Sequence, residues 1–197
     1  MRKEQEVTMP DDKKVTIYVV KPNNKVIAQA DMIRAKRWNE CIQDGIITKK
    51  ELSVLMEDRG IWDKNKSDQE SGITKSIQGL EKELYRGRGG KKPKVSEGRA
   101  TAFKMKDLRN KLRDLIGERL ALEENTAEAL SDNARFDYFV ATCTFYKDTE
   151  QKVYNSLEDY SNHSSDAVAF AAASMLGDIL YNLDASFEEN LPENKWL

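Results

Sequence analysis

Residues 86–98, which read RGRGGKKPKVSEG, interrupt two long stretches of helical periodicity and constrain the fold more than any other segment. Within 86–94 there are three glycines, one proline and five basic residues. Glycine and proline disfavour continuous helix or strand, and basic side chains lose hydration when they are buried. We therefore expect a basic loop or linker here, with helices on either side.

The part of the chain before this loop begins with a strand pattern. β-branched residues alternate through KVTIYVV (14–20), and PDDK separates this run from EVTM (6–9). The pattern predicts a short hairpin around a Pro-Asp turn. KPNNK (21–25) is a second turn signal, so 15–20 could instead pair with 25–29.

From about Val26 the apolar residues recur at helical spacing. We expect one helix that ends at Asp44-Gly45, a second that begins at Thr48, and a third that runs over 73–85. Glycine is common just after a helix because it tolerates a positive φ. Together the first two helices predict an αα-hairpin.

After the loop, apolar spacing predicts a long amphipathic helix from about Ser96 to Ala129, with a restart or kink at Ser131. A buried stripe then continues to Thr144. The apolar run 167–183 predicts a last helix. Its alanines and serines let another helix approach closely, so we expect it at the centre of a bundle or at a subunit contact.

Several helix starts are predicted from capping pairs, in which a side-chain oxygen accepts a backbone N–H of the first turn. The predicted pairs are Thr48 with Glu51, Ser67 with Glu70, and Asp148 with Gln151. Residues 160–166, YSNHSSD, are predicted to form a turn.

The fold class expected from these patterns is mainly α. It comprises a β-hairpin and αα-hairpin in 1–64, a helix and the basic loop in 65–95, and a helical bundle with an acidic C-terminal tail in 96–197. The ending Trp196-Leu197, without a cap or polar terminus, suggests a natural chain that continues further.

The stretch DGIITKKEL (44–52) resembles the second half of an EF-hand loop, with Gly45 at position 6 and Glu51 at position 12. The loop would then begin at Glu40 and place its third ligand at Ile42, which has no side-chain oxygen. Since a capping box explains the same residues without a metal, we expect a helical turn rather than a calcium site.

Charge is distributed unevenly along the chain. Between Arg86 and Arg113 there are eleven Lys or Arg and two acids, whereas from Asp148 onward there are ten acids and two lysines. We predict that the basic segment is an interaction site, formed by Arg86, Arg88, Lys91, Lys92, Lys94, Lys104, Arg109 and Arg113.

Two classes of partner remain open for the basic segment. It could contact the acidic half of the same protein or of a neighbour, or it could neutralise nucleic-acid phosphates. No aromatic residue between 86 and 102 is available for stacking on bases. Lys91 is followed by Lys92 and not by Ser or Thr, so the loop is not a phosphate-binding P-loop.

Catalytic and metal sites are not expected. One histidine and two cysteines nearly exclude a Cys/His zinc site, and Cys41 and Cys143 lie in apolar patterns typical of buried, reduced thiols. His163 has Ser164 and Asp166 beside it, but triad partners converge from separate elements, so we interpret this segment as a capping turn. We therefore expect no enzyme, no cofactor and no bound metal.

Residues 30–63 and the ending FEENLPENKWL (187–197) resemble an uncharacterised protein family of marine tailed (myovirus-type) bacteriophages. The resemblance covers most of the chain and implies a role in virion structure or tail assembly, in the cytoplasm of the infected bacterial host cell or in the virion. No site residue can be carried over from the family. With the charge pattern, it leads us to expect a non-enzymatic structural or assembly (chaperone-like) protein that binds protein partners or copies of itself, with nucleic acid as the alternative.

Two sequence features argue against membrane association. No run of about 18 apolar residues is present, as a membrane-spanning helix would need. The start MRKEQEVTMPDDKK lacks the apolar core of a secretory signal. We expect neither a membrane partner nor a secretory signal.

Overall fold

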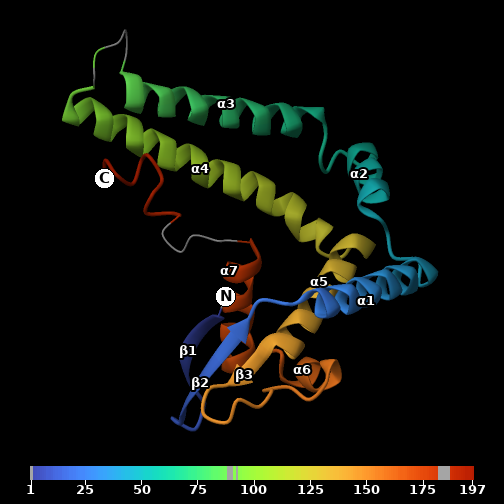
Figure 1. Cartoon of the computed structure of the whole chain (residues 1–197). Helices are drawn as coiled ribbons and strands as arrows, with labels where there is room; N and C mark the ends of the chain where they lie inside the picture. Colours follow the sequence, from blue (N-terminus) through green and yellow to red (C-terminus); the bar gives the residue numbers. More distant parts are fainter. Residues whose placement is uncertain (1, 88–90, 92, 182–186) are drawn as a thin grey trace. The chain divides into compact units, whose positions relative to one another are not determined.

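The computed structural model describes residues 2–87, 91, 93–181 and 187–197 (Figure 1). In chain order its elements are β1 (Arg2–Thr8), β2 (Lys14–Val20), α1 (Asn24–Gln43), α2 (Lys49–Asp58), α3 (Lys64–Arg86), α4 (Val95–Glu123), α5 (Ala127–Cys143), β3 (Thr144–Tyr146), α6 (Leu157–His163) and α7 (Ala167–Tyr181). The described chain is mainly α with an N-terminal β-hairpin and C-terminal helices, which confirms the predicted fold class. None of the described helices is long and apolar enough to cross a membrane.

The chain forms two compact units, and each is assembled from two stretches of sequence. Unit 1 contains Met1–Ile46 and Ala127–Asp184, and unit 2 contains Ile47–Thr126 and Ala185–Leu197. These boundaries differ from those of the three segments predicted from the sequence, 1–64, 65–95 and 96–197. Both units contain contacts between residues that are far apart in the sequence. Lys3 pairs with Asp178 in unit 1, and Arg109 pairs with Glu193 in unit 2.

Unit 1 contains an antiparallel sheet in the order β1-β2-β3. β1 and β2 form the predicted hairpin, with Gln5 opposite Ile17, and its turn places Asp12 at a φ of 58°. The alternative pairing of 15–20 with 25–29 is wrong, because Asn23 caps α1 and its side chain accepts the backbone N–H of Val26. β3, which the sequence analysis missed, pairs with β2 and places Tyr146 opposite Ile17.

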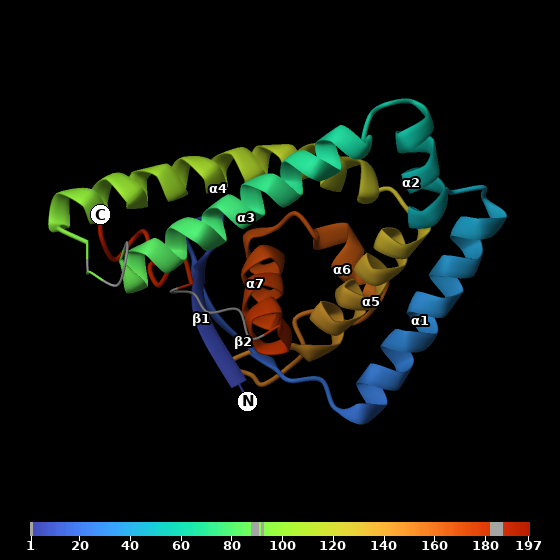
Figure 2. The ribbon, with the colours of Figure 1, turned by 90° about the horizontal axis from the view of Figure 1, so that it is seen from above.

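The core of unit 1 lies between the sheet and α7. Ile17 and Val19 of β2, and Ala172 and Leu176 of α7, are completely buried. The small residues of α7 allow this close packing against the sheet, whereas the sequence predicted a place at the centre of a helical bundle or at a subunit contact. Figure 2 shows α7 beside the sheet. At one edge the Lys3 ammonium donates to the Asp178 carboxylate over 2.8 Å.

α1 and α5 pack side by side in unit 1 (Figure 2). Polar contacts follow their common border. Arg135 donates to Asp31 over 2.6 Å, and the Tyr138 hydroxyl donates to the Gln29 side chain over 2.6 Å. These contacts fix the two helices against each other at several levels.

Residues 44–51 form the predicted helix end and helix start. Gly45 has a φ of 74°, the left-handed conformation that glycine favours after a helix. The Thr48 hydroxyl accepts the backbone N–H of Glu51, and the Glu51 carboxylate accepts the backbone N–H of Thr48 over 2.9 Å. These two hydrogen bonds satisfy backbone N–H groups that have no partner within the helix, and they stabilise the start of α2. The capping box therefore accounts for these residues, as predicted.

Two other predicted capping pairs are wrong. Ser67 and Glu70 lie inside α3, whose start is capped by Asp63 because its carboxylate accepts the backbone N–H of Lys66 over 2.9 Å. Asp148 and Gln151 belong to the connection that follows β3, and α6 is instead capped by Ser156.

Two predicted boundaries also differ. The long helix ends at Glu123, and α5 begins at Ala127, so Ser131 lies within α5 and does not restart the path. Its hydroxyl donates to the backbone carbonyl of Ala127. The predicted turn 160–166 is shorter, because α6 extends to His163.

Unit 2 is built on the antiparallel pair α3 and α4 (Figures 1 and 2). Ile77, Leu84 and Met105 form its buried core. At the opposite end of the pair, Arg119 donates to Glu70 over 2.9 Å, and its guanidinium lies 4.6 Å from the centre of the Trp62 ring.

We predict that Thr48→Ala lowers the free energy of unfolding by about 1 kcal/mol, because the substitution removes the hydroxyl that caps α2. Urea unfolding followed by helical circular dichroism measures this change. Ser53→Ala, at an exposed position within α2, is the matched control and leaves the stability unchanged or slightly higher. An equal loss in both variants contradicts the capping role.

The same cap has a defined pH dependence. The backbone N–H and the hydroxyl of Thr48 hold the pKa of Glu51 below its ordinary value. A lowered pKa means that this contribution is present above the unfolded-state pKa and is lost as the pH falls through the folded-state pKa. The difference in the free energy of unfolding between the Thr48→Ala variant and the unmodified protein therefore becomes smaller at acid pH.

Candidate functional site

The residues of the predicted basic segment occupy different positions around the α3–α4 pair. Arg86 is the exposed last residue of α3, and Lys94 is the N-cap of α4. Lys91 is exposed between the two helices, while Arg88 and Lys92 lie outside the described residues. Lys104, Arg109 and Arg113 all lie on α4.

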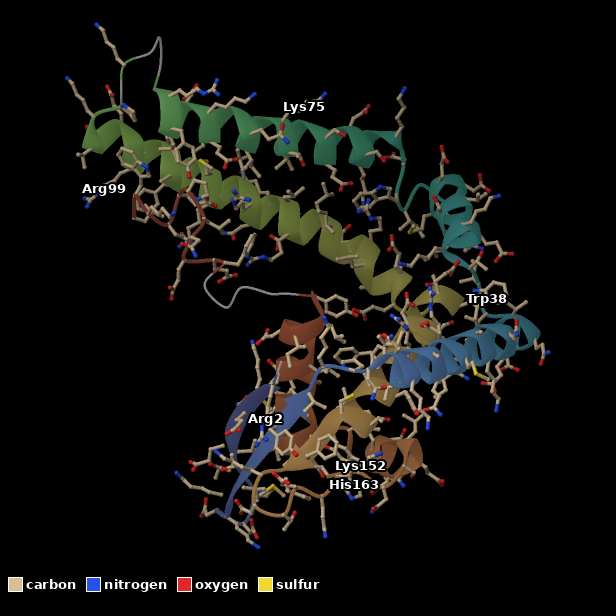
Figure 3. All side chains as sticks on the ribbon, viewed as in Figure 1. Arg2, Trp38, Lys75, Arg99, Lys152 and His163 are labelled. Atoms are coloured by element: carbon tan, nitrogen blue, oxygen red, sulfur yellow. The ribbon has the colours of Figure 1, made fainter. Side chains whose placement is uncertain are left out.

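The helical period divides the basic residues of α4 between two faces. Arg99, Lys106, Arg109 and Arg113 fall within one sector of the helix, and Lys104 lies on the other side. Figure 3 shows Arg99 projecting away from α3. The predicted residues therefore do not form one continuous surface, and we call the first sector the basic face.

The segment 187–197 runs beside α4 (Figure 1), and its Glu193 and Glu188 pair with Arg109 and Arg113 of the basic face. The segment has no helix or strand and folds through short turns, in which the backbone N–H groups of Leu191, Asn194 and Trp196 donate to carbonyls three residues earlier. These turns direct Glu193 and Trp196 toward α4.

Glu193 is the most buried charged residue among those described. It is 1% exposed, and the Nε of Arg109 donates to its Oε1. Its second carboxylate oxygen is buried without a hydrogen-bond partner. A buried carboxylate is costly unless it is paired, so the Arg109 guanidinium is required for this segment to dock.

Trp196 docks near the start of α4, at Gly98, which lies eleven residues or about three helical turns before Arg109. Its indole lies against Gly98, and a Cβ on Gly98 would overlap the ring. The indole also packs on the core of Ile77, Leu84 and Met105. The absence of a side chain at Gly98 thus forms the space that an aromatic ring fills.

Glu188 makes a weaker contact at the border. Its carboxylate lies 3.9 Å from the Arg113 guanidinium, and both side chains are more than two-thirds exposed. Water and salt screen such pairs strongly. Gly98, Met105 and Arg109 thus belong to the surface of α4 on which an acidic residue and an aromatic residue three positions apart pack. We call this contact surface the Gly98–Arg109 groove.

A hollow of about 520 Å³ lies at the end of the α3–α4 pair near the basic loop. Lys91 and Lys94 line it together with Glu83 and Glu97. The Glu97 carboxylate accepts the backbone N–H of Lys94 over 3.0 Å and so caps α4. Because acids and bases alternate around this hollow, it does not present the uniform positive charge that binds phosphate.

His163 lies in unit 1 at the end of α6 (Figure 3). Its Nδ1 is 2.8 Å from the carbonyl oxygen of Asp159, and this contact, with the charges of Asp159 and Asp166, raises the pKa of the imidazole. The neighbouring Ser164 hydroxyl donates to the carbonyl of Ser161 and not to the histidine. The geometry is that of a helix end, as predicted, and not of a catalytic triad.

A hollow of about 170 Å³ beside His163 is lined by Tyr154, whose buried hydroxyl has no hydrogen-bond partner among the described residues. Burial raises the pKa of this phenol, so it stays protonated at neutral pH.

Neither cysteine has the surroundings of a reactive thiol. Cys41 and Cys143 are free and buried, and burial raises the pKa of Cys143 to about 11. The thiolate of Cys143 is therefore not populated near neutral pH. Across residues 2–87, 91, 93–181 and 187–197, no group of three or more His, Cys, Asp or Glu side chains is arranged to hold a metal ion.

Sequence reasoning identified Arg109 and Arg113 but missed Gly98, Glu193 and Trp196. One signal was available, since a tryptophan in a polar, acidic segment needs an apolar surface to cover its ring. The location of that surface could not be read from local patterns, because the two stretches are 98 residues apart between Gly98 and Trp196.

Comparisons with protein-family models, with curated proteins and with solved structures found no match to the chain.

We predict that Arg109→Met releases the segment 187–197, because the substitution leaves the Glu193 carboxylate buried without a cation. The loss is about 3 kcal/mol, which corresponds to a shift of about 100-fold in the docking equilibrium. The loss cannot exceed the free energy of docking, since a released segment returns Glu193 to water. Limited proteolysis within 187–197 measures the shift as faster cleavage.

Arg113→Met is the matched control for this experiment. It also removes one guanidinium from α4, but its partner Glu188 is 80% exposed, so we expect a change below about 0.5 kcal/mol. Equal cleavage of the two variants contradicts a special role for the buried pair.

We also predict that Gly98→Ala displaces the Trp196 indole, because the new methyl group occupies the position of the ring. The indole N–H signal of Trp196 in a ¹H–¹⁵N spectrum then moves toward its position in an unfolded chain. Gly117→Ala, also in α4 but with nothing within 4 Å of the added Cβ, leaves that signal in place and stabilises the helix by about 0.5–1 kcal/mol. An unmoved Trp196 signal in Gly98→Ala contradicts this packing.

Proposed function

We propose that this protein is a non-enzymatic assembly protein that binds acidic segments of other protein chains on the basic surface around α3 and α4. The observation that supports this most directly is the docked segment 187–197. Its Glu193 and Trp196 occupy the Gly98–Arg109 groove, so this surface has the chemistry to bind a segment that carries an acidic and an aromatic residue.

Buried and exposed residues of this surface have different roles in binding: the buried contacts supply affinity, and the exposed cations supply long-range attraction. The indole against Gly98 and the buried pair of Arg109 with Glu193 supply contacts that exclude water. Arg99 and Lys106 are exposed, and neither makes an ion pair with a described residue. Exposed cations of this kind attract an acidic partner over a distance and set the salt dependence of association.

The proposed setting is the structure or assembly of a phage virion, in the host cytoplasm or in the virion itself. Its support is the resemblance of residues 30–63 and 187–197 to the phage family, together with a protein-binding surface that suits an assembly role. In this setting the basic segment 86–113 docks on acidic surfaces of virion proteins or of further copies, by charge complementarity between helix faces.

The alternative function is nucleic-acid binding through the same segment 86–113. The exposed Arg99, Lys104 and Lys106 favour it. The pairing of Arg109 with Glu193, and the acids that alternate with lysines near the loop, favour protein instead. Binding of nucleic acid would weaken steeply with salt, in proportion to the number of phosphates contacted.

We predict that simultaneous alanine substitution of Arg86, Arg88, Lys91, Lys92 and Lys94 weakens association of the protein with itself. The substitutions remove the charges that attract acidic surfaces. Light scattering on the eluting protein, at about 50 mM and about 500 mM salt, measures the change. The unmodified protein is expected to associate at low salt and to dissociate at high salt.

The matched control replaces five exposed lysines elsewhere, at Lys21, Lys25, Lys50, Lys64 and Lys75, and therefore changes the net charge equally. Its association remains that of the unmodified protein. Identical association of both variants contradicts the proposed role of the basic loop. Binding of a single-stranded or duplex oligonucleotide at low salt that is lost in the first variant alone would favour the nucleic-acid alternative.

A further inference from the structure

We infer that the segment 187–197 of one copy also docks into the Gly98–Arg109 groove of a second copy, so that the chain carries both a ligand and its receptor. This inference rests on the proposed function, because it names the partner of the same surface. The occupant is defined by its sequence, with Glu193 placed on Arg109 and Trp196 placed on Gly98.

The contacts that hold the segment are independent of which chain supplies it. The groove is formed by α3 and α4, within the stretch Ile47–Thr126 of unit 2, and the segment enters this unit only after α7 of unit 1. Its anchors are side chains and short turns internal to 187–197. Exchange between two copies therefore keeps every anchoring contact and changes only the effective concentration of the segment.

The fit of the groove favours this occupant over an arbitrary acidic chain. Glu193 is 1% exposed, and an ordinary acidic surface would not bring a carboxylate to this depth. The Trp196 ring lies so close to Gly98 that a Cβ at this position would overlap it. A ligand must therefore carry an acid and an aromatic residue at the spacing found in 193–196.

Reciprocal exchange fills both grooves of a pair. Each copy gives its segment and receives one, so the assembly closes with two-fold symmetry and no groove is left empty. One-way exchange instead leaves a groove and a segment free at the two ends and continues into a chain of copies. Both forms increase with protein concentration at the expense of docking within one chain.

Two full-length variants with complementary defects test this inference. The acceptor carries Glu193→Ala and Trp196→Ala, so its own segment no longer competes for an intact groove. The donor carries Gly98→Ala and Arg109→Glu, so its groove is closed while its segment is intact. Each variant alone is expected to remain a monomer, in sedimentation or light scattering, at about 300 mM salt where attraction by exposed charges is screened.

An equimolar mixture is expected to form a one-to-one complex. The control mixture contains the same donor and an acceptor that also carries Arg109→Glu, and its association is weaker by about 100-fold. Circular dichroism verifies that every variant retains its helices. If the donor has lost them, a labelled peptide of residues 187–197 replaces it, and binding to the acceptor is followed by fluorescence anisotropy.

The outcomes separate this inference from the function on which it rests. A complex in the first mixture and not in the control supports exchange between copies. If the first mixture stays at the monomer mass, or the peptide does not bind the acceptor, the inference is overturned. The proposed function still stands in that case if the unmodified protein associates at low salt and alanines in 86–94 abolish the association.

Discussion

The buried ion pair between Arg109 and Glu193 is the interaction on which the organisation of unit 2 depends. Glu193 is almost completely buried, and the Arg109 guanidinium donates to its carboxylate. Removing the Arg109 guanidinium leaves the Glu193 carboxylate buried without a cation for as long as the segment stays docked. The pair therefore connects residues 187–197 to α4. Through it, the basic face of α4 binds this acidic segment.

The two units use different means to hold distant residues together. In unit 1 the hairpin β1–β2 is covered by α7, and apolar residues such as Ile17 and Leu176 supply the contacts. In unit 2 the core of Ile77, Leu84 and Met105 is small, and a ring and an ion pair complete it. A small core that is completed by a terminal segment is better suited to exchange of that segment than a core formed entirely by helices and strands.

Local features of the fold could be predicted from the sequence, and long-range ones could not. Gly45 with Thr48 gives a helix end and a helix start through interactions within a few residues. Ser67 failed as a cap because Asp63, slightly earlier, offers a carboxylate to the same turn. β3 and the docking of Trp196 depend on partners about a hundred residues away. The basic character of the site was predicted, but its division between two faces and its acidic occupant were not.

The most direct test of this account is a nuclear Overhauser measurement from the indole protons of Trp196 in the full chain. Docking of Trp196 predicts cross-peaks to the Hα protons of Gly98, which the ring contacts, and to side chains of the buried core formed by Ile77, Leu84 and Met105. Indole shifts typical of an unfolded chain, without a cross-peak to any residue of α4, would contradict the docking of 187–197. The buried pair and the exchange between copies would then lose their structural basis.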